Sequence, residues 1–198
     1  TSGIDTVVGN TTISATSGSA IRLSGTGQLL LDSSTGPINL SSSATPQQHA
    51  LYVLGNGVIT STGLSPLSIS ASGTSASGVQ VEGSGNVTLS GATILTTGAA
   101  SVTSSVIGSY GAFALGANTQ MSLTGGSITT TGETAVGAYV QGGRLALSNV
   151  AIHTEALTAF VLAGNSYGAY GLNAATGGQL TASGGSVVTD GAFGIGVR

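Results

Sequence analysis

The stretch Gly111–Gly132 reads GAFALGANTQMSLTGGSITTTG, and variants of this phrase recur on both sides of it. Glycine separates three short runs that contain apolar residues, which are Gly111–Phe113, Met121–Leu123 and a run led by Ile128. Apolar and polar residues alternate within these runs, as they do along a β-strand. Repetition of this phrase is therefore the main feature that the fold has to explain.

The second and third runs keep a constant distance from each other. The four clear copies are Val87–Leu89 with Ile94, Met121–Leu123 with Ile128, Leu145–Leu147 with Ile152, and Leu180–Ala182 with Val187. Each copy has a gap of five residues, and an odd gap would turn the next apolar residue outward unless a corner intervenes. Glycine and asparagine suit the backbone angles of a corner. The predicted corners are Gly91-Ala92, Gly125-Gly126, Asn149-Val150 and Gly184-Gly185.

The first run contains glycine, alanine and an aromatic residue in four places. These are Gly111–Phe113, Gly137–Tyr139, Gly168–Tyr170 and Gly191–Phe193. Their starts are 26, 31 and 23 residues apart (137 − 111, 168 − 137, 191 − 168), which predicts a repeat of a little over twenty residues plus insertions. The candidate insertions are residues 41–48, 99–109 and 156–166.

Three strands, three corners and a fixed period predict a three-sided parallel β-helix that forms one all-β solenoid domain over residues 1–198. At about 22 residues per coil, the chain would have eight or nine coils. In the central coil, Phe113 and Leu115 would form one wall, and Met121 with Leu123 the next. Ile128 and Thr130 would form the third, with Thr130 in an internal threonine ladder. The alternative is an antiparallel sandwich, which the constant five-residue gap disfavours.

Composition excludes several classes of function. Only 5% of the 198 residues are charged, against about 25% in ordinary domains, and the chain has three arginines and no lysine. Nucleic acid binding needs a cationic stripe, so we expect none. The lack of cysteine excludes disulfides and thiolate metal sites. An apolar content of 40% argues against disorder, and no apolar run approaches the ~20 residues of a membrane helix.

A search for catalytic groups finds none with a convincing context. Neither His49 nor His153 lies in a G-x-S-x-G context, and both are predicted to be surface histidines. The carboxylates Glu133, Glu155 and Asp190 follow the third run and would line one edge, where solubilising charge is the favoured interpretation. We therefore predict no catalytic, metal or cofactor site. The candidate surface contacts are Arg22, Glu133, Arg144, His153, Glu155 and Asp190.

The phrase LTGGSITTTGETAVGAY (Leu123–Tyr139), together with DGAFGIGVR (Asp190–Arg198), resembles the passenger domains of Gram-negative autotransporters, and the pertactin-like group most closely. The resemblance covers about residues 77–198, and residues 1–76 fit more loosely. It implies a right-handed β-helix that a C-terminal outer-membrane β-barrel exports and that is displayed or released as an adhesin. The barrel strands and an Arg-Gly-Asp tripeptide are missing from this sequence.

The resemblance and the missing chemistry together predict a non-enzymatic segment of a bacterial cell-surface or secreted passenger that mediates adhesion. Its partner would be a host-cell surface protein, a glycan or the extracellular matrix, with homotypic association as a further expectation. The alternatives are a self-associating rod that drives aggregation or biofilm, a structural stalk, and a carbohydrate-active β-helix enzyme. Since Arg198 ends in mid-repeat, we also expect an uncapped C-terminal coil.

Overall fold

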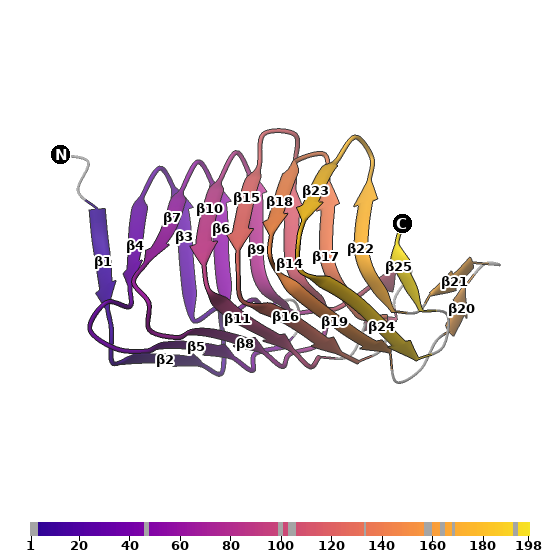
Figure 1. Cartoon of the computed structure of the whole chain (residues 1–198), viewed down its shortest axis with the longest axis horizontal. Helices are drawn as coiled ribbons and strands as arrows, with labels where there is room; N and C mark the ends of the chain where they lie inside the picture. Colours follow the sequence, from indigo (N-terminus) through magenta and orange to yellow (C-terminus); the bar gives the residue numbers. More distant parts are fainter. Residues whose placement is uncertain are drawn as a thin grey trace.

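The computed structural model describes residues 4–45, 48–98, 101–102, 106–132, 134–156, 160–162, 165–167, 169–191 and 194–198. These residues form seven coils, each of which contributes one strand to each of three parallel sheets. Figure 1 shows the coils side by side along one axis, with the two chain termini at opposite ends of the rod. No helix among the described residues is long and apolar enough to cross a membrane.

The three sheets run the length of the solenoid. Sheet A contains β1 (Ile4–Val8), β4 (Gln28–Asp32), β7 (Val58–Thr62), β10 (Asn86–Ser90), β15 (Gln120–Thr124), β18 (Arg144–Ser148) and β23 (Gln179–Ser183). Sheet B contains β2 (Thr11–Ala15), β5 (Ile38–Ser42), β8 (Leu67–Ala71), β11 (Ala92–Thr96), β16 (Ser127–Thr131), β19 (Ala151–Ala156) and β24 (Ser186–Gly191). Sheet C contains β3 (Ile21–Gly25), β6 (Leu51–Gly55), β9 (Ser77–Gly83), β14 (Tyr110–Leu115), β17 (Val136–Gln141), β22 (Tyr170–Ala175) and β25 (Ile195–Val197).

The prediction of a three-sided parallel β-helix is confirmed, but the expected eight or nine coils are wrong. The corner between sheets B and C varies in length and lengthens several coils. The strands β1 and β4 start 24 residues apart (28 − 4), whereas β18 and β23 start 35 apart (179 − 144). Two antiparallel hairpins lie at this corner, β12 (Ser101–Val102) with β13 (Val106–Ile107), and β20 (Phe160–Leu162) with β21 (Asn165–Tyr167).

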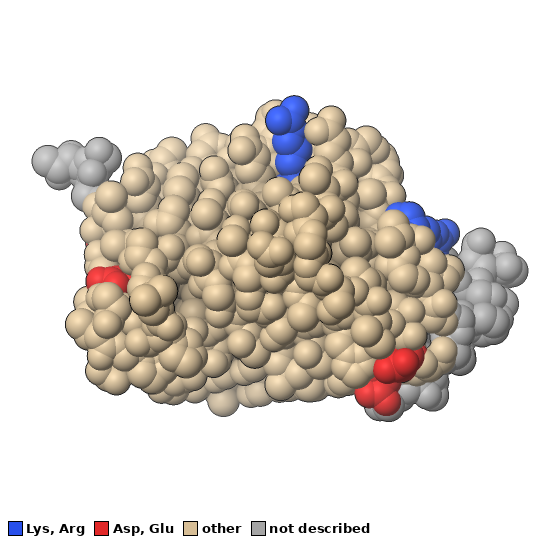
Figure 2. All heavy atoms as spheres, in the orientation of Figure 1, with Lys and Arg blue, Asp and Glu red and all other residues tan. Residues whose placement is uncertain are grey.

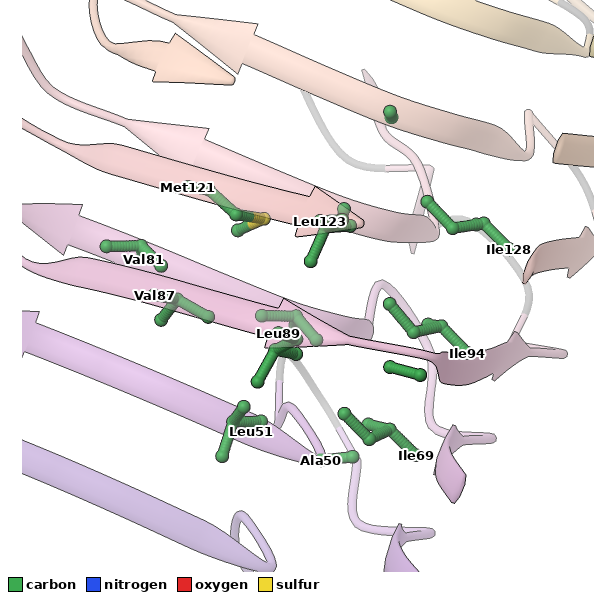
Figure 3. Close-up of a cluster of buried hydrophobic side chains, with 14 of the residues drawn as sticks. Ala50, Leu51, Ile69, Val81, Val87, Leu89, Ile94, Met121, Leu123 and Ile128 are labelled. Atoms are coloured by element: carbon green, nitrogen blue, oxygen red, sulfur yellow. The ribbon is translucent and has the colours of Figure 1, made fainter. Parts of the chain in front are cut away.

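The predicted alignment of the second and third runs is confirmed, because equivalent residues on successive coils pair with one another. Met121 pairs with Val87 and Leu145 in sheet A, and Ile128 pairs with Ile94 and Ile152 in sheet B. Figure 3 shows Ile69, Ile94 and Ile128 one above another, facing the apolar side chains of sheet A. Like residues on successive coils therefore stack into continuous apolar columns inside the rod.

The corner between sheets A and B has the geometry that the five-residue gap requires. Gly91, Gly125, Asn149 and Gly184 occupy this corner in successive coils, with φ of 64°, 64°, 55° and 66°. The left-handed conformation reverses the alternation, so the next apolar residue points inward again. The corners are also hydrogen-bonded to one another, since the N–H of Gly125 donates to the carbonyl oxygen of Ser148 at 2.7 Å.

The predicted threonine ladder is internal. Thr96, Thr130 and Thr154 pair in register and are fully buried. The Oγ1 of Thr96 donates to the carbonyl oxygen of Tyr110 at 3.1 Å. The Oγ1 atoms of Thr130 and Thr154 have no hydrogen-bond partner among the described residues. One position of the ladder is therefore satisfied and two are not.

This difference gives a matched pair of substitutions. We expect Thr130→Val to raise the free energy of unfolding by about 1 kcal/mol, because valine keeps the shape and removes a buried unpaired hydroxyl. We expect Thr96→Val to lower it by about 1 kcal/mol, because that change breaks a hydrogen bond and leaves the Tyr110 carbonyl short of a donor. Urea denaturation followed by far-UV circular dichroism measures both. A shift of the same sign in the two variants would contradict the assignment.

The register predicted for the first run is correct at Gly111 and Gly137 and wrong further along the chain. Tyr170 pairs with Val136 and not with Tyr139, and Gly171 stacks on Gly137, while the predicted Gly168 lies outside the described residues. The fourth predicted copy, Gly191–Phe193, falls partly outside the described residues, and Gly196 occupies the stacking position. The inward-facing glycine therefore sets the register of sheet C, because it packs against the isoleucine column of sheet B.

Candidate binding groove on sheet C

The outer face of sheet C differs from those of the other two sheets. On sheet B, outward positions carry mainly small hydroxyl residues, such as Ser68, Thr93 and Ser127 in one register column. The equivalent column of sheet C carries large aromatic and amide side chains. It runs through Arg22, Tyr52, Gln80, Phe113, Tyr139 and Asn173.

Two consecutive residues of β14 face the interior, and an aromatic residue on either side of them faces outward. A Cβ atom at Gly111 would meet the Ile128 side chain, so Gly111 faces the interior, and Ala112 is fully buried beside it. Tyr110 and Phe113 flank this pair and lie on the outside. The prediction that Phe113 and Leu115 form an interior wall is therefore wrong, because Gly111 disrupts the simple alternation.

Three of these rings form an aromatic cluster of Tyr110, Phe113 and Tyr139. The ring centroids are 4.7 Å apart for Tyr110 and Phe113, 4.9 Å for Phe113 and Tyr139, and 5.3 Å for Tyr110 and Tyr139. Burial raises the pKa of Tyr110 to about 12 and also raises the pKa of Tyr139. Both phenols therefore remain protonated, uncharged hydrogen-bond donors at neutral pH.

Two hollows lie along this face and share Tyr110 and Tyr139, and we call them together the sheet C groove. The larger has a volume of about 520 Å³ and the smaller about 270 Å³. The larger hollow is lined by Arg22, Gln48, His49, Tyr52, Ser75, Gln80, Glu82, Tyr110, Phe113, Leu115, Tyr139 and Gln141. Its size falls within the range of small-ligand sites.

Hydrogen bonds order the polar floor of the larger hollow. The Ser77 hydroxyl donates to Oε1 of Gln80 at 2.8 Å, and Nε2 of Gln80 donates to Oε1 of Glu82 at 2.5 Å. The Tyr139 hydroxyl donates to Oε1 of Gln141 at 3.3 Å. These bonds hold Gln80, Glu82 and Gln141 before any ligand arrives, which reduces the entropic cost of binding.

Charge is balanced at the end of this hollow nearest β3. The Arg22 guanidinium lies over the Tyr52 ring, 5.6 Å from its centroid. Burial and the neighbouring Glu82 carboxylate raise the pKa of Tyr52 to about 12, while Arg22 opposes this shift. Arg22 and Glu82 thus contribute one positive and one negative charge to the same hollow.

His49 is buried, which corrects its predicted surface position. Only 7% of the residue is exposed, and its ring packs edge-on against Tyr52 with centroids 5.0 Å apart. Its Nδ1 accepts a hydrogen bond from the Ser77 backbone N–H at 3.0 Å, so the neutral ring carries its proton on Nε2. Burial lowers the pKa of His49 to about 4. His49 lies in the corner between β5 and β6, outside the alternating pattern of the strands, so the sequence gives no periodic signal for its burial.

The lowered pKa of His49 predicts a loss of stability in mild acid. The unfolded chain, with a histidine pKa of 6.5, takes up this proton before the folded chain does. The contribution of neutral His49 to the free energy of unfolding is therefore complete above pH 6.5. It falls by about 3 kcal/mol as the pH drops from 6.5 to 4. Urea denaturation at intervals between pH 7 and pH 4 measures it. His49→Gln should flatten the dependence of the free energy of unfolding on pH, and replacement of the exposed His153 by glutamine should leave that dependence as it is. An unchanged pH dependence in His49→Gln would contradict the prediction.

The six candidate contacts are spread over different faces. Arg22 lies in the sheet C groove, whereas Arg144 begins β18 in sheet A beside Gln120. Glu133 lies outside the described residues. His153, Glu155 and Asp190 come together on the outer part of sheet B, described next.

His153 and Asp190 form an exposed hydrogen-bonded pair. The Nε2 of His153 lies 2.8 Å from Oδ2 of Asp190, with side chains 47% and 61% exposed. Glu155 pairs in register with Asp190 on the neighbouring strand. The described residues contain no group of three or more histidine, cysteine or acidic side chains arranged to hold a metal ion. The outward position predicted for His153 is confirmed.

Residue scarcity is the signal in the sequence that could have located the groove. The chain has five tyrosines, and four of them (Tyr52, Tyr110, Tyr139 and Tyr170) line the two hollows. Two of the three arginines, Arg22 and Arg198, lie there as well.

Comparison of the chain with protein-family models, with curated proteins and with solved structures gave no significant match.

Proposed function

We propose that this chain is a segment of an autotransporter-type passenger of the pertactin-like kind, and that it mediates adhesion at the bacterial surface or after release. The observation that carries the proposal is the gathering of scarce tyrosine, arginine and histidine side chains in one preorganised groove. A rod whose other faces carry small hydroxyl residues would present this groove to a host-cell surface protein, a glycan or the matrix.

The groove favours binding over catalysis. Glu82 is the one carboxylate among the described residues that line the larger hollow, and it already accepts a hydrogen bond from Gln80. Glycoside hydrolysis commonly needs a pair of carboxylates on opposite sides of the bond. The Nδ1 of His49 is occupied by the Ser77 N–H and is not free to take a proton from a ligand. These arrangements support a non-enzymatic adhesin.

The solenoid also suits export. Each coil is stabilised mainly by its neighbours, so the chain can fold progressively as it emerges from a pore. The sequence contains no cysteine, so no disulfide can form before or during passage. We therefore propose that the parent protein carries a C-terminal outer-membrane β-barrel.

Adhesion of latex beads coated with the purified chain tests the proposal. We expect beads to bind host epithelial cells or immobilised matrix, and Tyr139→Ala with Gln141→Ala to reduce binding about tenfold, because both groups line the larger hollow. Leu95→Ala is the matched control, since Leu95 is 40% exposed on the outer face of sheet B. Binding at the level of uncoated beads, or an equal loss in the control, would overturn the proposal.

Self-association is a second candidate, supported by the weak charge of the rod. Figure 2 shows a broad face with few charged side chains, which offers little electrostatic repulsion to a second copy. Sedimentation velocity over a range of concentrations measures this directly. Thr129→Arg on the outer face of sheet B should suppress the concentration dependence, and a chain that stays monomeric at high concentration would exclude the candidate.

A further inference from the structure

We infer that the larger hollow of the sheet C groove binds a neutral, linear glycan that lies along the solenoid axis. This inference rests on the proposed function, because it assigns a ligand class to the surface through which adhesion is proposed. The argument uses the length of the hollow, the chemistry of its lining and the pairing of the strands beneath it.

The hollow is elongated along the rod. Its lining comes from β3, β6, β9, β14 and β17, which are consecutive neighbours in sheet C. Neighbouring strands lie about 4.8 Å apart, so the lining spans about 19 Å along the axis. The smaller hollow continues from Tyr110 and Tyr139 toward β22. A site of this length suits a chain of repeated units better than a compact metabolite.

The lining matches the two kinds of surface that a sugar ring presents. The faces of a pyranose carry C–H groups, which are attracted to the electron-rich faces of aromatic rings such as Tyr52 and Tyr139. The hydroxyl groups at its edges need both donors and acceptors. Gln141 offers amide donors that bond to no described residue, and Glu82 offers carboxylate oxygens. An apolar ligand would leave these polar groups unpaired, at a cost.

Charge balance favours a neutral ligand over an anionic one. Recognition of phosphate or a polyanion relies on clustered arginine and lysine. In the larger hollow, Arg22 is the one cation among the described lining residues, and the Glu82 carboxylate lies in the same hollow. Burial keeps His49 neutral at pH 7 because it lowers the pKa of the imidazole to about 4. A polyanionic chain would therefore meet little net attraction.

The position of the hollow on a sheet face disfavours an extended peptide. Peptides that bind by strand addition pair their main chain with an exposed sheet edge. The central strands of sheet C are hydrogen-bonded on both sides, as β9 is to β6 and β14. A peptide lying across them would lose its own backbone hydrogen bonds to water without replacement. A glycan has no such backbone to satisfy.

Tyrosine fluorescence provides a direct test, because the chain contains no tryptophan and four of its five tyrosines line the groove. The probes are hexasaccharides of β-1,4-linked glucose, α-1,4-linked glucose, β-1,4-linked mannose and β-1,4-linked N-acetylglucosamine, with hexagalacturonate as the charged comparator. We expect at least one neutral probe to bind saturably, at least tenfold more tightly than hexagalacturonate, and with an affinity that 0.5 M sodium chloride leaves unchanged.

Three variants locate the binding site. Tyr139→Ala and Gln141→Ala should each weaken the best neutral probe about tenfold, while Leu95→Ala should not change it. Gln141→Ala removes none of the three rings of the aromatic cluster, so its comparison with Tyr139→Ala separates loss of the amide group from loss of a ring. Circular dichroism of each variant verifies the fold. Failure of all four neutral probes, preference for hexagalacturonate, or an equal effect of Leu95→Ala would overturn the inference.

Bead adhesion after enzymatic removal of cell-surface glycans separates this inference from the proposed function. Adhesion that persists after glycan removal but is lost in Tyr139→Ala would overturn the glycan inference and leave adhesion through the groove intact. Binding of a neutral hexasaccharide by a chain that adheres to no cell or matrix would have the opposite meaning. It would support the ligand class and overturn the adhesive role.

Discussion

Replacing Gly111 by alanine should lower the free energy of unfolding by about 3 kcal/mol or more, which is the upper end of the cost of overpacking a core. A Cβ atom at this position would overlap Cγ2 of Ile128 and would lie 2.5 Å from the carbonyl oxygen of Gly137. The first contact is with a β-branched side chain and the second with backbone, so neither can move aside easily. Urea denaturation followed by far-UV circular dichroism measures the loss.

The same contact recurs along the rod, which makes the effect of Gly111→Ala more than local. Added Cβ atoms at Gly78, Gly137 and Gly171 would meet Ile94, Ile152 and Val187 in the same way. Displacement of one isoleucine would therefore disturb the column above and below it, and we expect faster amide exchange in the adjacent coils. Gly18→Ala is the control, because its Cβ atom would meet nothing within 4 Å. Equal midpoints for the two variants would contradict the prediction.

The interior of sheets A and B could be predicted from the sequence because its signals are local and strictly periodic. The five-residue gap required a corner, and Gly125 and Asn149 adopt the left-handed conformation there. The isoleucine column followed because each coil places Ile94, Ile128 and Ile152 at the same distance from that corner. The same apolar column continues into the earlier coils, where Leu40 pairs with Ile69, but the corner between sheets A and B is longer there, since β4 ends at Asp32 and β5 begins at Ile38.

Sheet C was harder to predict because two physical effects compete there. Aromatic residues dominate the sequence pattern, but burial of glycine against isoleucine decides the register, so Tyr170 was assigned to the wrong slot. The break in alternation at Gly111 and Ala112, which both face the interior, then places Phe113 on the outside. Corner insertions of varying length removed the fixed period that would have given the coil number. The groove depends on the register of sheet C and on the outward position of Phe113, and neither could be predicted from the sequence pattern. Of the residues that line it, only Arg22 was predicted to be a surface contact.

The second large effect is expected for Ile128→Ala, which should lower the free energy of unfolding by about 3–4 kcal/mol. Ile128 is 1% exposed and is covered by Ile94 on one side and Ile152 on the other. The rigid sheets above and below limit collapse of the space that the substitution leaves, so the cavity cost adds to the lost apolar burial. Leu95→Ala, a change on the opposite face of sheet B, should stay within about 0.5 kcal/mol.

Combination of the two substitutions tests the packing argument most directly. Ile128→Ala removes the Cγ2 atom that a Cβ atom at Gly111 would overlap, so the new methyl group can occupy part of the vacated space. The double variant should therefore be at least 1 kcal/mol more stable than the sum of the single effects predicts. If the two effects simply added, the glycine and isoleucine columns would not be in contact in solution. The register of sheet C would then need another cause, and the outward position of Phe113, on which the groove depends, would lose its explanation.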